Sequence, residues 1–328
     1  MRKALLALAA LSSVSAAASA QSSVTIYGLV DAGIVKSNGG TAFNPGAPTT
    51  KAWTLAPAYA NRLGFRGIED LGGGLSAQFQ LEHRFNIETG ATTNSASFWQ
   101  GVSTVTLSSS SLGSVYFGRD YVPVFWTTLR ADPFTWSGAG RMDTATWAGF
   151  RAPNYGQGAG IRTSNTVGYK TPSFGGLTFQ AAVGLSGSTG AGRGNGFNVE
   201  YLAGPMYLGA GYEKISGGPV DGNSLMAITG AYNLGFIRPV ASYSRAKVGS
   251  NNNTFYSIGA TAPVGTGLLK AMYYRFNPEG SNNDQSKFGF GYDYLLSKRT
   301  TVYGDLGTAR EDTKSTNTTY GVGLRHTF

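Results

Sequence analysis

Four arginines and one glutamate are the residues of this chain whose chemistry is easiest to assign. Each lies in a segment where apolar and polar residues alternate, as in LSAQFQLEHRFNIE at 75–88. A period of two puts all the polar residues of an extended strand on one face. The charged residues that this alternation places on polar faces are Arg62, Arg66, Glu82, Arg84 and Arg162. In a water-filled passage, rings of arginine favour anions, whereas rings of aspartate or glutamate favour cations.

The stretch 121–160 shows no alternation and carries charges of both signs. It holds Trp126, Trp136 and Trp147, together with Arg130, Arg141, Arg151, Asp132 and Asp143. A connection of this length is usually functional or disordered, and three tryptophans favour a packed segment. If it folds inward, we expect Asp132 and Asp143 to face the arginines across a constriction. Four arginines then oppose three carboxylates, Glu82 included, which predicts a transverse field and a mild preference for anions.

Other kinds of chemistry lack the residues that they need. The chain has no cysteine and two histidines, His83 and His326. Both histidines fall on the apolar face of their segments, where neither can serve as the base of a Ser-His-Asp site. The glycine-rich stretches 156–160 and 190–196 lack the Lys-Ser/Thr ending of a phosphate loop. We therefore predict no catalytic residue, no metal site and no cofactor.

The first twenty residues are typical of a cleaved secretory signal. Arg2 and Lys3 precede an apolar stretch at 4–11, and small residues end at Ala20. The apolar stretch is shorter than the roughly 20 residues that a membrane-spanning helix needs. No later segment has an apolar run of that length, so any insertion into a membrane must use strands. The sequence predicts a signal peptide at 1–20 and one exported domain at 21–328.

Composition and connection lengths predict how this domain folds. Glycine fills 48 positions and charged residues make up 13% of the chain, about half the share usual in soluble proteins. Seven short turns alternate with eight longer polar stretches, which gives sixteen strands. We predict an all-β fold, a transmembrane 16-stranded antiparallel β-barrel with an inward-folded third loop at about 121–160. A barrel of this width is not filled by side chains, so its polar inner face predicts an aqueous channel.

Five strings in a specific order and spacing carry a family resemblance. They are SSVTIYGLVDAG (22–33), RLGFRGIEDLGGGLSAQFQLE (62–82), GSVYFGRDYVP (113–123), TSNTVGYKTPSFGGL (163–177) and GVGLRHTF (321–328). Together they resemble Gram-negative general porins of the trimeric sixteen-stranded type. The resemblance implies a homotrimer, an eyelet narrowed by the third loop, and passive diffusion of small hydrophilic solutes. It also implies that Arg62 and Arg162 match eyelet arginines of anion-selective relatives, whereas a further basic position falls on the uncharged segment 100–102.

The expected function is a passive outer-membrane channel for small hydrophilic solutes and inorganic ions, with mild anion preference. The expected partners are two further copies of the chain, outer-membrane lipid and lipopolysaccharide. The net charge of +9 comes without a basic run, so nucleic acid is not an expected partner. Two alternatives remain. A barrel-borne hydrolase would need an inward-facing histidine, and a non-conducting adhesin or structural barrel would lack an inward constriction loop.

Overall fold

The computed structural model describes residues 23–48, 50–142, 147, 150, 161–185, 192–218, 220–281 and 283–328. The predicted signal peptide and Asp143 lie outside these residues. The helix is α2 (Pro123–Leu129), and the strands are β1 (Ser23–Ser37), β2 (Thr54–Leu55), β3 (Arg62–Gly72), β4 (Leu75–Arg84), β5 (Val102–Ser109), β6 (Gly113–Tyr121), β7 (Arg162–Lys170), β8 (Leu177–Gly184), β9 (Arg193–Ala203), β10 (Met206–Ser216), β11 (Ser224–Tyr232), β12 (Arg238–Val248), β13 (Asn251–Val264), β14 (Gly267–Asn277), β15 (Gln285–Leu295), β16 (Thr300–Glu311) and β17 (Asn317–Thr327).

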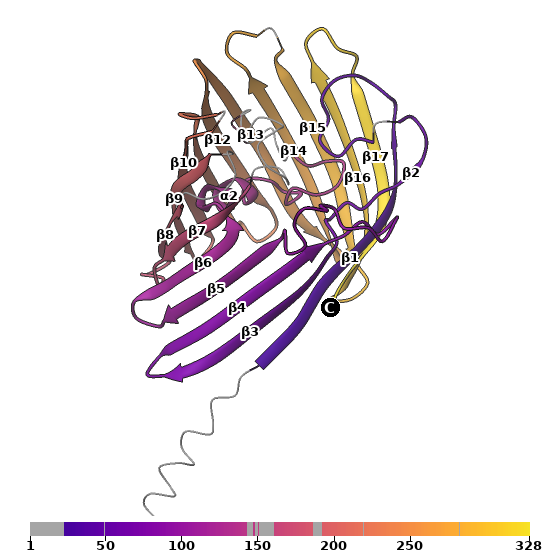
Figure 1. Cartoon of the computed structure of the whole chain (residues 1–328). Coiled ribbons are helices and arrows are strands. Elements are labelled where there is room, and N and C mark those ends of the chain that lie inside the picture. The colour runs from indigo at the N-terminus through magenta and orange to yellow at the C-terminus, as the bar shows by residue number, and fades with distance from the viewer. Residues whose placement is uncertain are drawn as a thin grey trace, which may run out of the picture.

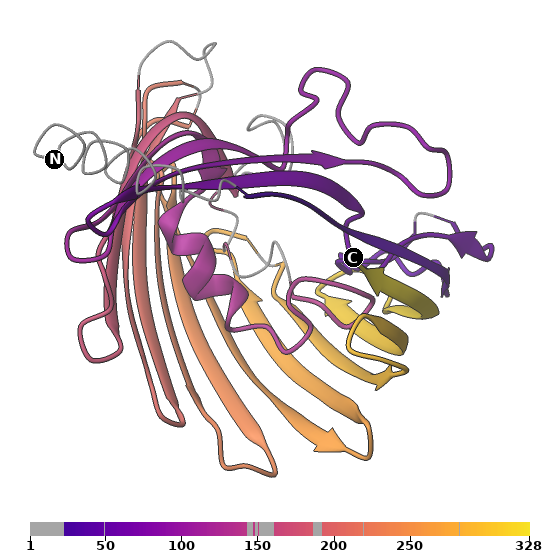
Figure 2. The ribbon, with the colours of Figure 1, turned by 90° about the horizontal axis from the view of Figure 1, so that it is seen from below.

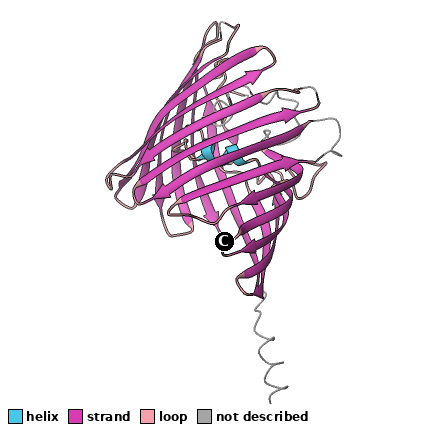
Figure 3. Cartoon of the chain, turned by 90° about the vertical axis from the view of Figure 1, so that its left-hand side faces the viewer, coloured by secondary structure: helices cyan, strands magenta, loops and turns pink. Residues whose placement is uncertain are grey.

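The strands form one closed antiparallel sheet. Each long strand pairs with the next along the chain, and β1 closes the ring by pairing with both β3 and β17. Apart from the two-residue β2, which pairs with β1, sixteen strands make up the wall in the described part of the chain. Figures 1 and 3 show these strands tilted around a common interior. The predicted 16-stranded antiparallel β-barrel is therefore confirmed.

Connection lengths alternate as the sequence predicts, but one strand is shorter than expected. The alternation at 75–88 predicted a strand of that length, whereas β4 ends at Arg84. Beyond it the backbone of Asn86 bonds to Ala91 and Gly90, so the chain turns back on itself. The alternation of residue types past Arg84 therefore does not mark a strand, and burial no longer alternates there.

The two faces of the wall have reversed polarity compared with a soluble protein. Outward side chains are large, apolar and exposed, as with Ile258 at 65% and Val105 at 62%, whereas inward Glu213 and Thr319 are fully buried. His83 and His326 are outward, as predicted: the His83 ring stacks on Phe98 at 4.1 Å, and His326 bonds to a hydroxyl of β16. No helix among the described residues is long and apolar enough to cross a membrane.

The main apolar core lies inside the ring of strands, where α2 and the residues after it meet the inner wall. Figure 2 shows α2 within the ring, and it contacts β8, β9, β10 and β11. Val124 and Phe134 pack in one cluster with inner-wall side chains such as Ile215 and Tyr274. Glycines on the wall make room for this segment. A Cβ at Gly307 would lie 2.0 Å from the Ala139 carbonyl oxygen, so a larger residue there would displace the segment.

Candidate functional site

Three arginines gather on the inner wall at the ends of their strands nearest the long loops. We call Arg62, Arg84 and Arg162 the arginine cluster. Arg62 on β3 pairs directly with Arg84 on β4 across the sheet, and Arg162 begins β7. Like charges that face each other across a sheet destabilise it. The strands therefore hold these charges together at a cost in stability, which is typical of a functional site.

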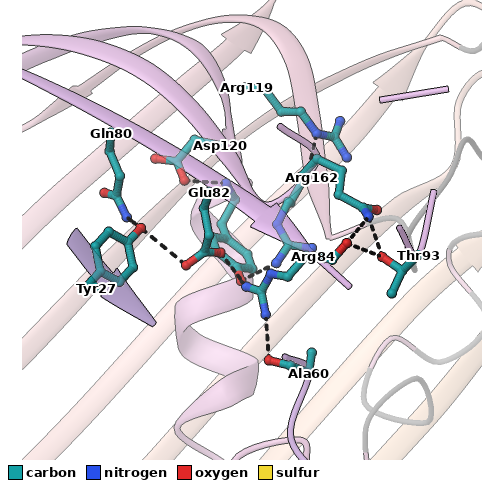
Figure 4. A network of polar contacts seen from close by, with 11 residues as sticks. Tyr27, Ala60, Gln80, Glu82, Arg84, Thr93, Arg119, Asp120 and Arg162 are labelled. Atoms are coloured by element: carbon teal, nitrogen blue, oxygen red, sulfur yellow. Dashed lines mark hydrogen bonds and ion pairs between the residues drawn. The ribbon is translucent and has the colours of Figure 1, made fainter. Parts of the chain in front are cut away.

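Arg84 is the best-bound member of the cluster. Its Nη2 lies 2.6 Å from a carboxylate oxygen of Glu82 and 3.2 Å from the Tyr121 hydroxyl, and its Nη1 donates to the Ala60 carbonyl. The other oxygen of Glu82 accepts a hydrogen bond from Tyr27 at 3.3 Å. Figure 4 shows Glu82 between the tyrosine and the guanidinium. Both Glu82 and Arg84 are more than 90% buried, so this ion pair is a fixed part of the wall.

Tyr121 joins the cluster to α2. The Arg162 guanidinium lies 4.0 Å above the Tyr121 ring and donates to its hydroxyl. On its other side the same ring stacks on Phe125 of α2 at 4.0 Å. A cation over an aromatic face is attracted to it. One tyrosine thus orients two arginines and ties them to the segment inside the barrel.

The cluster has more donors than its protein partners use. Among the described residues, the buried Nε atoms of Arg62, Arg84 and Arg162 have no hydrogen-bond partner, and Arg62 has no ion pair. Two further charged residues, Arg119 and Asp120, lie beside the arginine cluster. Arg119 donates to the Gln100 carbonyl and to Ser164, and Asp120 interacts electrostatically with Arg162. The site is an array of cationic donors whose direct carboxylate partner among the described residues is Glu82.

The structure brings together four of the seven predicted site residues, namely Arg62, Glu82, Arg84 and Arg162. Arg66 lies further along β3 with its guanidinium 5.7 Å from the Tyr27 ring, and it is exposed. Asp143 lies outside the described residues. The parity of the strands therefore placed these four side chains correctly on the inner face of the wall.

Asp132 differs from the prediction that it faces the arginines. It is 3% exposed, and its carboxylate accepts backbone N–H groups of Phe134, Trp136 and Met142 at 2.8, 3.1 and 3.0 Å. Burial raises the pKa of Asp132, and these three hydrogen bonds oppose the rise. The carboxylate of Asp132 therefore holds the loop backbone in place. The sequence could not show this, because a segment without regular alternation does not indicate in which direction a side chain points.

Sequence reasoning missed Tyr121. A β-bulge between Gly118 and Asp120 shifts the register of β6 against β7, so alternation alone does not place residues at the end of β6. The signal that could have found Tyr121 is its position as the last residue before the long loop. Among the described residues, no group of three or more His, Cys, Asp or Glu side chains is placed to hold a metal ion.

Comparison with known proteins identifies the family. The model of the Gram-negative porin family matches residues 6–314. The chain belongs to the Gram-negative porin family. It is 34% identical to outer membrane porin protein 32 of Delftia acidovorans over the full length of both chains. It is 27% identical to the major outer membrane protein P.IB of Neisseria meningitidis serogroup B, again over both whole chains.

A solved structure supports the same assignment. An anion-selective porin from Comamonas acidovorans matches with a TM-score of 0.76 and 31% identity, over 94% of this chain and all of that one. The resemblance inferred from the five sequence strings is confirmed. The protein is a porin of the outer membrane, and its barrel is a passive channel through that membrane.

Proposed function

We propose that this porin passes small hydrophilic solutes with a preference for anions, which the arginine cluster sets. The observation that carries the proposal is that, among the described residues, the three arginines Arg62, Arg84 and Arg162 have one direct carboxylate partner, Glu82, which pairs with Arg84. Charges exposed to water are screened over about 8 to 10 Å at physiological salt. A permeating ion passes within that distance of wall charges only where the channel is narrow, so the charges there decide ion selectivity. An excess of guanidinium there lowers the energy of an anion and raises that of a cation.

Residues 122–142 would form the other side of the narrow point. The stacking of Phe125 on Tyr121 supports this, because it fixes the interior segment against the wall beside Arg162. The bound state of Asp132 leaves fewer carboxylates to oppose the arginines than the sequence suggested. The proposal assigns the barrel no catalytic role, since both histidines point outward.

Reversal potentials in a salt gradient test the anion preference. The unmodified channel should show the sign of an anion-preferring pore, and this potential should shrink as the salt concentration rises. The double variant Arg62→Gln and Arg162→Gln should bring the potential close to zero or reverse it. Arg66→Gln is the matched control, because it removes the same charge from the same face of β3 outside the cluster. Cation preference in the unmodified channel would contradict the proposal.

We also propose that the porin works as a homotrimer surrounded by lipopolysaccharide. The resemblance to trimeric porins supports the assembly. The exposed outward side chains of Arg245, Lys247 and Arg310 near the loop ends support binding to anionic headgroups. Chemical cross-linking in native membranes should give a three-subunit band. Replacing these three residues with glutamine should lower the lipopolysaccharide that copurifies, and an unchanged amount would contradict that part.

A further inference from the structure

Two further arginines, Arg130 and Arg238, lie inside the barrel, away from the arginine cluster. Arg130 directly follows α2, and its side chain is 41% exposed. Its Nε donates to the Glu200 carboxylate at 2.9 Å, and its guanidinium lies 5.3 Å from the centre of the Tyr207 ring. The Tyr207 hydroxyl donates to the same oxygen of Glu200 at 2.7 Å. Glu200 and Tyr207 thus orient Arg130 through its Nε and its flat face, and its terminal nitrogens form no hydrogen bond with the described residues.

Arg238 is the second member of the pair. It begins β12 on the same inward face as the buried Val240. Its side chain forms no hydrogen bond or ion pair with the described residues, yet it is close enough to Arg130 and Tyr207 to interact with both electrostatically. Tyr207, Ala231 and Val240 form one row across β10, β11 and β12. Two strand spacings, about 10 Å, therefore separate Tyr207 from the strand that carries Arg238.

This pair lies at the opposite end of the wall from the arginine cluster. The segment from Val124 to Arg130 runs along β10 toward the short turn that precedes this strand. Val124 packs at Gly211, Thr127 packs at Gly209, and Arg130 reaches Tyr207. Tyr207 is the second residue of β10 after a short turn, and Arg238 is the first of β12 after another. The arginine cluster, in contrast, lies where its strands meet long loops. In outer-membrane barrels the short turns face the periplasm.

We propose that Arg130 and Arg238 form a second anion-binding station at the periplasmic mouth of the channel, which takes small oxyanions such as carboxylate or phosphate. Glu200 neutralises Arg130, and Arg238 has no carboxylate partner among the described residues. The two guanidinium groups together therefore keep a net positive charge that faces the lumen. The planar fork of a guanidinium matches an oxyanion in two-point contact, which distinguishes these ligands from chloride. The station deepens the proposed function, because it lies on the same permeation path beyond the arginine cluster.

The test is inhibition of the chloride current by inorganic phosphate in planar bilayers, with phosphate added to each side in turn. In single unmodified channels, phosphate should inhibit at lower concentration from one side than from the other. In the double variant Arg130→Gln and Arg238→Gln, half-inhibition from the sensitive side should need about tenfold more phosphate, as expected for the loss of charge-assisted hydrogen bonds. Acetate should follow phosphate, whereas bromide of the same concentration, which has no pair of oxygens for the guanidinium fork, should show little difference between the two sides.

One control variant and one single variant make the result specific. Arg299→Gln removes a positive charge from the exposed turn between β15 and β16 at the same end of the barrel, and should leave the inhibition unchanged. Arg238→Gln alone should raise the half-inhibition concentration without disturbing the wall, because the Arg238 side chain makes no hydrogen bond or ion pair with the described residues. If the double variant keeps the phosphate sensitivity of the unmodified channel, the station is excluded. The reversal potential of the same channels reports the arginine cluster separately, so failure of the proposed function would be seen there.

Discussion

Two charged regions of the inner wall are built in opposite ways. In the arginine cluster, Arg84 pairs with Glu82, and Arg62 and Arg162 form no ion pair among the described residues. Across the barrel, Lys270 lies 2.6 Å from Asp293 and 3.3 Å from Asp305, and these charges are balanced within a network. Lys270 is 2% exposed. Charges that hold the barrel and its interior segment together are thus paired and buried, whereas the arginine cluster carries an excess of positive charge.

The balanced network also supports the interior segment. The Lys270 ammonium lies 4.8 Å from the Phe134 ring, and a Cβ at Gly138 would collide with the Asp305 carboxylate. Arg325 reaches Asp293 at 3.5 Å from β17. The network therefore joins four strands, β14 to β17, to the segment that follows α2.

The largest effect should come from breaking this network. Lys270→Gln would leave Asp293 and Asp305 buried side by side without their shared cation, and should destabilise the barrel by about 3 to 5 kcal/mol. Urea unfolding of the protein in lipid vesicles measures the change. A loss below about 1 kcal/mol would show that the network contributes no more than exposed ion pairs do.

A smaller loss should follow from Tyr121→Phe. The hydroxyl that accepts hydrogen bonds from Arg84 and Arg162 disappears, whereas the ring and its stacking on Phe125 remain. The unfolding free energy should fall by about 1 kcal/mol, and the channel should keep its anion preference because no charge changes. Loss of that preference would mean that arginine orientation, rather than charge excess, sets selectivity.

The smallest effect, and the one with the opposite sign, should come from Arg62→Gln. This change relieves the repulsion between the paired Arg62 and Arg84 and breaks no ion pair among the described residues. The barrel should become more stable by up to about 1 kcal/mol, while the reversal potential moves toward zero. A destabilisation like that of Lys270→Gln would abolish the distinction between the two regions.

The regular part of the molecule could be predicted from the sequence, because alternation reports on which side of a wall a residue lies. This parity placed Arg62, Glu82, Arg84 and Arg162 on the inner face, and loop lengths gave the strand number. It could not give the direction of Asp132, which lies in a segment without a period. It could not give the contact of Tyr121 with two arginines either, since a bulge interrupts the phase of β6.

The position of the apolar core has a consequence for how the pore is made. Side chains of the interior segment find their partners on β10 to β14, strands that are synthesised long after α2, and the ring closes only when β17 reaches β1. Contacts between residues so far apart in sequence form slowly, because a long loop must close before they are gained. The narrow point that we propose for the channel would therefore be among the last features to take shape during assembly.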